Sequence, residues 1–314
     1  MKRRYKIIFA LCLCIGALGW FSEFFGPSVY VEEEKVLKGE DYISVTGDGD
    51  NSAQKENVSS SDDRGGSPPV ISAEGAILTD VKTGEVLFEK NADKKLYPAS
   101  TTKIMTAMVA LEILDEIDAD LDSMVTVPAA AVNAEGSSVY LKAGEKISMR
   151  ELMYGMMLQS GNDAALTVAI CCGGTEEEFI KRMNMKASEL GCSSTMFKNP
   201  SGLFDEGHYT TARDLAKISR AAMERKELRE IVGSKDWKSE DTNRNFHNKN
   251  KTIFQYAGAT GIKIGYTKAS GRTLVASAKR GERELMAVVL NDSNWFADAY
   301  AMLDYGFSAG SVMR

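Results

Sequence analysis

A serine and a lysine three residues apart form a group in this sequence that could do covalent chemistry. Ser100 and Lys103 follow Pro98, and the run from Ser100 to Leu111 contains neither glycine nor proline and has recurring apolar positions. This pattern predicts a buried helix that begins at or near Ser100. Residues three apart share one helix face, so the Lys103 amine would lie beside the Ser100 hydroxyl.

The chemistry of this pair depends on the protonation state of Lys103. A serine hydroxyl is a poor nucleophile at neutral pH unless a base lies beside it. A lysine can be that base only when its pKa is lowered, and a helix N-terminus, burial and a second nearby cation all lower it. Because the Ser-x-x-Lys spacing also occurs by chance, its interpretation depends on the rest of the sequence.

The composition argues against several other kinds of site. The chain has 314 residues, a formal net charge of −6 and 44% hydrophobic residues, which fits one large domain or two interleaved lobes. The acidic balance argues against nucleic-acid binding. His208 and His247 are far apart, so we expect no histidine-based metal site or Ser-His-Asp triad and no cofactor, and His208 is interpreted as a structural hydrogen-bonder. Adjacent Cys171 and Cys172 are interpreted as small core residues rather than redox groups.

Residues 1–25 have the pattern of an export leader. Four basic residues within the first six precede an apolar run from Ile7 to Phe21, and no clear cleavage site follows. The leader is therefore either a cleaved secretion signal or a retained anchor that tethers the protein to the membrane through residues 7–22. Both alternatives predict an exported protein at the extracellular face of the membrane or in the cell wall.

The rest of the chain divides into a linker and one domain. Residues 26–72 are predicted to be a flexible linker, because the stretch 45–69 is rich in Gly, Ser, Asp and Asn and ends in two prolines. Such a linker would suit an enzyme that must reach a surface polymer, and a disordered pro-segment is the alternative. Residues 73–314 are predicted to form the globular domain, with no additional C-terminal β-domain.

Strand patterns occur at both ends of this domain and helical patterns between them. Strands are expected at residues 75–79, 85–89, 260–267, 272–279 and 284–291. Helical patterns dominate residues 111–225, including a methionine-rich helix at 148–157 and a helix opened by a capping box at Thr211–Asp214, and a closing helix is expected at 295–307. Strands from both termini imply an antiparallel sheet with an inserted helical lobe, an α/β (α+β) fold.

Two further short motifs follow the pair Ser100 and Lys103. They are Ser160–Asn162, at the end of the methionine-rich helix, and Lys263–Gly265, on a predicted strand. Alone, the first could merely cap a helix, and the lysine of the second could be an exposed strand residue. In this order the three motifs resemble Ser-x-x-Lys, Ser-x-Asn and Lys-Thr-Gly of the penicillin-recognising serine D-alanyl-D-alanine carboxypeptidases, the low-molecular-mass penicillin-binding proteins.

This resemblance extends over about residues 73–308, including 199–203, 207–214 and 303–307. It implies a β-lactamase/DD-peptidase-like fold, which is a five-stranded antiparallel sheet flanked by helices with a mainly helical lobe. It also implies a hydrolase of peptidoglycan synthesis that trims the last D-alanine from stem peptides ending in D-Ala-D-Ala, affects cell shape and binds β-lactam antibiotics.

The resemblance further implies a role for each motif residue. Ser100 would attack the carbonyl between the two D-alanines and form an acyl-enzyme, while Lys103 accepts its proton. Ser160 would relay a proton toward the leaving amine, in contact with Lys263. Asn162 would hold the substrate amide and orient Lys103. Lys263 would keep Lys103 neutral and attract the substrate carboxylate.

The same resemblance assigns substrate-binding roles to the strand around the third motif. The backbone N–H groups of Ser100 and Tyr266 would form the oxyanion hole, with Gly265 beside them, and one such donor is worth about 10²–10³ in rate. Where relatives have a threonine that binds the substrate carboxylate, this chain has Ile264. The lost hydrogen bond corresponds to a roughly 10- to 150-fold loss of rate. Arg272 is expected to substitute, which predicts an active enzyme that is impaired or has a shifted substrate preference.

Two alternative functions remain. A β-lactamase is one, but no Glu-x-x-Leu-Asn segment is present to supply a deacylating carboxylate, and Ser160–Asn162 has the carboxypeptidase form. A catalytically impaired wall-binding protein is the other, and Ile264 is the feature that motivates it.

Overall fold

The computed structural model describes residues 58–59 and 67–309 of the chain. The predicted export leader and most of the predicted linker lie outside these residues. Within them, the structure contains no helix that combines the length and the apolar character needed to span a membrane. Within the predicted linker, Val58–Ser59 forms a short strand.

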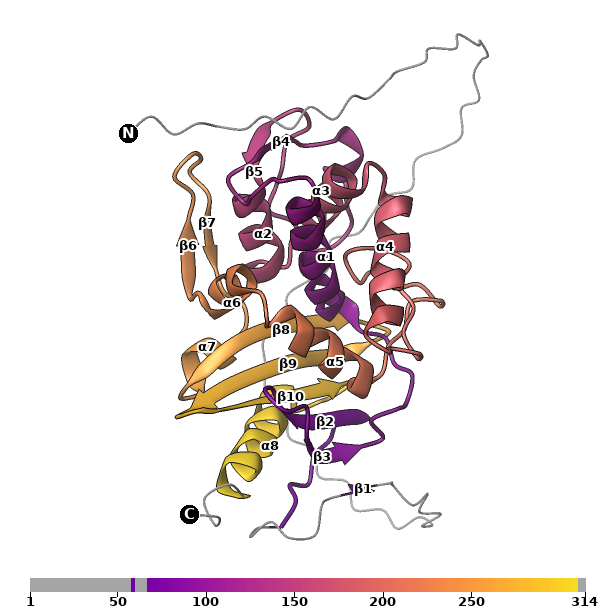
Figure 1. The fold of residues 1–314 in the computed structure, drawn as a ribbon, viewed down its shortest axis with the longest axis vertical. Coiled ribbons are helices and arrows are strands. Elements are labelled where there is room, and N and C mark those ends of the chain that lie inside the picture. Colours follow the sequence, from indigo (N-terminus) through magenta and orange to yellow (C-terminus); the bar gives the residue numbers. More distant parts are fainter. Residues whose placement is uncertain (1–57, 60–66, 310–314) are drawn as a thin grey trace, which may run out of the picture. The chain divides into compact units, whose positions relative to one another are not determined.

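One antiparallel sheet forms the centre of the domain (Figure 1), and its strand order is β1-β3-β2-β10-β9-β8. The five longer strands confirm the predicted five-stranded sheet, and β1 adds two residues at the β3 edge. The bounds are β1 Val58–Ser59, β2 Gly75–Asp80, β3 Val86–Lys90, β8 Ala259–Thr267, β9 Gly271–Arg280 and β10 Arg283–Leu290.

The two ends of the domain meet where β2 pairs with β10. Ile77 lies opposite Val288, and both side chains are buried. Seven of the eight residues of β10 are buried, as expected for an apolar strand with both faces covered. This pairing explains how a hairpin near residue 80 and three strands after residue 259 form one sheet.

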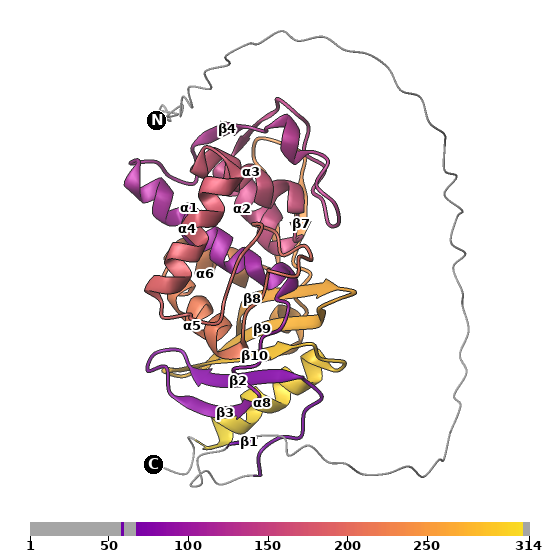
Figure 2. The same cartoon turned by 90° about the vertical axis from the view of Figure 1, so that its right-hand side faces the viewer.

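Helices cover both faces of the sheet (Figure 2). α8 packs on one face, and α5 and α6 lie on the other, toward the helical lobe of α1, α2, α3 and α4. The bounds are η1 Ala99–Thr102, α1 Lys103–Glu116, η2 Ala129–Ala131, α2 Met149–Leu158, α3 Asn162–Gly173, α4 Glu176–Glu189, α5 Ala212–Ala222, α6 Lys226–Gly233, α7 Thr252–Gln255 and α8 Trp295–Ala309. Two small hairpins, β4 Met124–Thr126 with β5 Lys146–Ser148 and β6 Asp236–Lys238 with β7 Asn245–His247, complete the described elements.

Several local predictions are confirmed. The Thr211 side chain accepts a hydrogen bond from the Asp214 backbone N–H at 3.0 Å and begins α5. All four methionines of α2 are buried. Cys171 and Cys172 are only partly buried, at the margin of the larger core, because α3 exposes this end toward solvent.

Two apolar cores stabilise the domain. The larger one lies between the helical lobe and the facing side of the sheet, and the smaller one lies between the sheet and α8. Every residue of α1 from Lys103 to Leu111 is buried. A helix enclosed on all sides has few alternative positions, so α1 fixes the side chain of Lys103 at its N-terminal end.

Candidate active site

Ser100 lies on η1, directly before α1. The predicted helix therefore begins as a 3₁₀ turn, and the α-helix itself starts at Lys103. The hydroxyls of Thr101 and Thr273 both donate to the Pro98 carbonyl, at 2.6 and 3.1 Å. Thr273 belongs to β9, so these two bonds fix the Ser100 turn to the sheet.

Lys103 makes three short contacts at the centre of the site. Its Nζ lies 3.0 Å from Ser100 Oγ, 2.7 Å from Asn162 Oδ1 and 2.7 Å from the Ser201 carbonyl oxygen. A neutral amine has two N–H groups and one lone pair. It can therefore donate to Asn162 and Ser201 and accept from the Ser100 hydroxyl, which is the geometry that a general base needs.

The environment of Lys103 favours this neutral form. Burial lowers its pKa well below the ordinary lysine value, and the charges of Lys263 and Lys249 lower it further. Asp163 acts in the opposite direction but does not outweigh them. The side chain is fully buried, so water cannot compensate an ammonium charge there. Lys103 therefore has the lowered pKa that a lysine needs in order to act as a base.

Lys263 reaches the same region from β8 and is also buried. Burial and the nearby charge of Lys249 lower the pKa of Lys263 to about 7. Its Nζ donates to the Ile264 carbonyl at 3.1 Å. Ser160 connects α2 to α3 with a positive φ of 64° and is 6% exposed. Among the described residues, no hydrogen bond joins Ser160 to Lys263, and the Lys263 amine instead bonds to a carbonyl of its own strand.

Asn162 begins α3 and uses both ends of its side-chain amide. Its Oδ1 accepts from Lys103, and its Nδ2 donates to the Glu135 carbonyl at 2.5 Å. The neighbouring Asp163 is buried and accepts from the backbone N–H groups of Val139 and Leu141. These bonds hold the loop 135–141 against the site. Asn162 therefore orients Lys103, as predicted, and its amide is engaged by the protein.

β8 passes directly beside the nucleophile. A side-chain carbon placed on Gly265 would lie 2.8 Å from the Ser100 backbone nitrogen and 3.0 Å from the Ala99 Cβ. Only glycine allows this approach. The next residue, Tyr266, is 65% exposed at the edge of the sheet. The backbone segments of Ser100 and Tyr266 thus adjoin each other.

Ile264 and Arg272 lie on the α8 face of the β8–β9 pair, opposite the face of Lys263 and Gly265. Ile264 is partly buried against the apolar cluster under α8. Arg272 lies opposite Tyr266, is exposed, and donates from Nη1 to the Ser293 carbonyl at 3.2 Å. The structure does not bring the Arg272 side chain into contact with Ser100 or Lys103, so its role as a carboxylate partner stays a prediction.

Lys249 and the Ser201 carbonyl are site groups that the sequence did not identify. Lys249 follows β7, and its Nζ donates to the Gln159 carbonyl at 3.0 Å, next to Ser160. The polar loop around it was a recognisable feature, but nothing in its spacing distinguishes Lys249 from its neighbour Lys251. Ser201 contributes only a backbone atom, which no pattern of side chains reveals.

His208 has the structural role that the sequence predicts. Its Nδ1 accepts from the Lys198 backbone N–H at 3.2 Å, so its Nε2 carries the hydrogen and donates to Thr102 Oγ1 at 2.9 Å. Burial lowers the pKa of His208 to about 4, so the ring is neutral. Through its hydrogen bond to Thr102 of η1, His208 supports the Ser100 turn.

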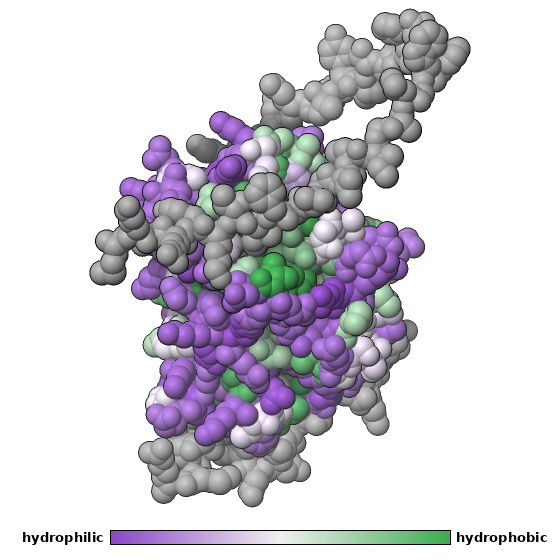
Figure 3. Space-filling model, turned by 45° about the horizontal axis from the view of Figure 1, so that its top comes forward, coloured by the Kyte–Doolittle hydropathy of each residue, from purple (hydrophilic) through white to green (hydrophobic). Residues whose placement is uncertain are grey.

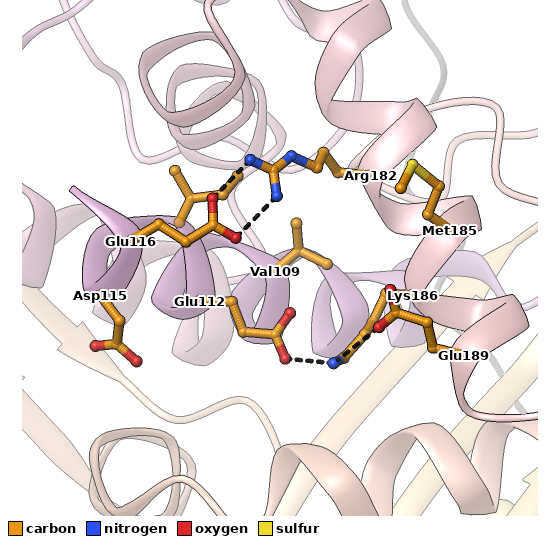
Figure 4. A pocket seen from close by; sticks show the side chains of 9 residues that line it. Val109, Glu112, Asp115, Glu116, Arg182, Met185, Lys186 and Glu189 are labelled. Carbon is orange, nitrogen blue, oxygen red and sulfur yellow. Dashed lines mark hydrogen bonds and ion pairs between the residues drawn. The ribbon is translucent and has the colours of Figure 1, made fainter.

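A separate pocket of about 330 Å³ lies between α1 and α4 (Figure 4). Its charged groups pair with one another: Arg182 binds Glu116, and Lys186 binds Glu112. Glu112 follows Lys103 by nine residues on the same helix, about 13 Å along its axis. This pocket is therefore distinct from the Ser100 site.

Comparisons with known proteins agree with this geometry. The sequence model of the D-alanyl-D-alanine carboxypeptidase family, peptidase family S11, matches residues 62–294. The chain is 39% identical over 242 residues to D-alanyl-D-alanine carboxypeptidase DacF of Bacillus subtilis, covering 75% of this chain and 62% of that protein. It is 37% identical over 250 residues to DacC of Escherichia coli, covering 76% of this chain and 62% of that protein.

A solved structure shows the same fold. The crystal structure of the Streptomyces K15 DD-transpeptidase superimposes with a TM-score of 0.73 at 33% identity, covering 77% of this chain and 99% of that one. The chain spans less than two thirds of the length of the two curated carboxypeptidases and nearly all of the length of this transpeptidase.

Proposed function

Because this chain belongs to the D-alanyl-D-alanine carboxypeptidase family, we propose that it is a serine-type carboxypeptidase that removes the terminal D-alanine from peptidoglycan stem peptides. The observation that carries this proposal is the 3.0 Å contact between Ser100 Oγ and a buried Lys103 amine whose pKa is lowered. The protein would act outside the cytoplasm, where this polymer lies, and would be acylated by β-lactam antibiotics.

In the first half of the reaction, Ser100 Oγ forms a bond to the carbonyl carbon between the two D-alanines as Lys103 takes the hydroxyl proton. The negative charge that develops on the carbonyl oxygen is stabilised by the backbone N–H groups of Ser100 and Tyr266. The C–N bond then breaks, and the leaving amine receives the proton from Lys103 through Ser160. Free D-alanine departs, and Ser100 carries an ester.

In the second half, water replaces the departed amine. Neutral Lys103 accepts a proton from this water as the oxygen attacks the ester carbon. The Ser100–acyl bond breaks, and Ser100 regains the proton. Lys263 attracts the substrate carboxylate when it is charged, and its pKa of about 7 leaves it partly charged at neutral pH.

Mass spectrometry of the penicillin-treated protein tests this proposal. We expect one covalent adduct on the peptide that contains Ser100, and no adduct in the Ser100→Ala variant. The purified protein should also release D-alanine from a stem pentapeptide. An adduct on another residue would contradict the mechanism, and rapid turnover of a chromogenic cephalosporin would indicate a β-lactamase instead.

A catalytically impaired wall-binding protein is the second candidate, because Ile264 stands in place of the family's threonine. Absence of penicillin labelling in the wild type, together with labelling of the Ile264→Thr variant, would favour this alternative.

A further inference from the structure

The aromatic rings of Tyr97 and Phe204 lie on two segments that adjoin the Ser100 turn, and neither has a role in the chemistry described above. Among the described residues, few large apolar side chains are exposed, and on the face shown in Figure 3 hydrophobic surface occurs in small patches among hydrophilic residues. Phe204 is one of these exposed side chains, at 52%. Its ring packs edge-on against that of Tyr97, with centroids 5.0 Å apart. Exposure of an apolar ring to water is unfavourable in free energy, and a ligand that covered the ring would remove this penalty.

The loop that carries Phe204 is rigid. Asn199 Oδ1 accepts hydrogen bonds from the backbone N–H groups of Ser201, Gly202 and Leu203, and Asn199 Nδ2 donates to the Leu203 carbonyl. This network fixes the turn that precedes Phe204. A binding surface that is already ordered loses little conformational entropy when a ligand binds.

The same loop is fixed to the Ser100 turn. Gly202 lies against the Ala99 carbonyl, and the Ser201 carbonyl accepts from Lys103. On the other side of the pair, Tyr97 precedes Ser100 by only three residues. Both rings are therefore positioned relative to the reacting oxygen by short, direct connections.

The position of this ring pair identifies the part of the substrate that it would contact. Ala99 lies between Gly265 of β8, which approaches its Cβ, and Gly202, which approaches its carbonyl oxygen. The loop of Phe204 and the strand of Lys263 thus contact different sides of the nucleophile's turn. If Lys263 on the β8 side attracts the carboxylate of the leaving D-alanine, the acyl part of the substrate would extend toward the side of the turn that carries the two rings.

We propose that Tyr97 and Phe204 form an apolar subsite for the acyl side of the substrate, selective for acyl donors that carry a flat or aliphatic group there. This inference rests on the proposed function. In a β-lactam the equivalent group is the side chain attached to the ring amide, and in a stem peptide it is the residue that precedes the penultimate D-alanine.

A pair of penicillins tests the subsite. Benzylpenicillin and 6-acetamidopenicillanic acid have the same ring and the same amide, and differ only in the phenyl group. We expect the wild type to be acylated faster by benzylpenicillin, and Phe204→Ala to reduce the ratio of the two acylation rate constants by about 2- to 12-fold, the range of one aromatic contact. Tyr97→Ala should reduce the ratio similarly, whereas Tyr97→Phe, which keeps the ring, should preserve it.

The control variant is Met185→Ala, which removes an exposed apolar side chain on α4. Its ratio should equal that of the wild type. If Phe204→Ala is acylated by both penicillins with an unchanged ratio, the subsite is wrong and the proposed function stands. If neither penicillin acylates the wild type, the proposed function fails, and the subsite fails with it.

Discussion

The backbone of Gly202 lies directly against the carbonyl of Ala99, the residue before the nucleophile. A side-chain carbon on Gly202 would lie 1.8 Å from the Ala99 carbonyl oxygen, and Gly202 has a positive φ of 85°. Ala99 itself has a positive φ of 47°, which is unusual for a residue with a side chain. Two loops about a hundred residues apart in the chain therefore pack directly against each other, and the conformation of Ala99 is the unusual one.

Gly202→Ala should displace the Ser100 turn, because the added carbon cannot fit at 1.8 Å from backbone. We expect penicillin acylation to fall by about 10²-fold, in line with the effect of small misplacements of reacting groups. The matched control is Gly191→Ala. Gly191 also has a positive φ, of 67°, but open space surrounds it. Equal acylation rates of the two variants would show that the contact between Gly202 and Ala99 does not control the position of Ser100.

Lys263 should determine the alkaline side of the pH profile. The active form has neutral Lys103 and charged Lys263. The acylation rate constant therefore rises with pH as Lys103 loses its proton and falls as Lys263 loses its own near pH 7. Lys263→Arg keeps the charge at all accessible pH values. Stopped-flow labelling between pH 5 and 9 should show the descending limb in the wild type and not in this variant. Retention of that limb would assign it to another group.

Asn162→Asp should shift the ascending limb. This substitution places a carboxylate where Asn162 Oδ1 now accepts from Lys103 at 2.7 Å, and a nearby negative charge favours the ammonium form. We expect the pKa of Lys103 to rise, because the added carboxylate stabilises the ammonium form, and the ascending limb to move to higher pH. Asn162→Ala, which removes the acceptor without adding charge, should lower the rate but leave the limb near its wild-type position. Identical profiles for the two variants would argue against Lys103 as the base.

If position 264 binds the substrate carboxylate, as the family resemblance implies, Ile264→Thr should raise the kcat/KM for D-alanine release by about tenfold, because its hydroxyl would supply one hydrogen bond. If the side chain at 264 only packs under α8, as that of Ile264 does, the threonine should give no gain. Ile264→Val is the matched control, since valine has the shape of threonine without the hydroxyl. Both variants lose an apolar contact under α8, which should cost about 1 kcal/mol of stability and can be measured by thermal unfolding. A threonine variant no faster than the valine variant would exclude this role for position 264.

Features of this protein that depend on local patterns could be predicted from the amino-acid sequence alone. Strand patterns at the two ends of the domain identified the five longer strands to within about one residue, and the Thr211 cap located the start of α5. The one-turn spacing of Ser100 and Lys103 correctly placed their side chains in contact, because three residues span about one helical turn. Resemblance in three motifs supplied the family.

The environment of Lys103 could be known only from the folded structure. Its hydrogen-bond partners Asn162 and Ser201 lie 59 and 98 residues away, and Lys249 lowers its pKa from a loop that carries no recognisable motif. Burial, the distance between charges and the position of backbone acceptors all depend on how the chain folds in space. The spacing of residues along the sequence predicts contacts only within about one helical turn. The candidate reacting residues can therefore be predicted from the sequence, whereas the fold sets the environment that lowers the pKa of Lys103.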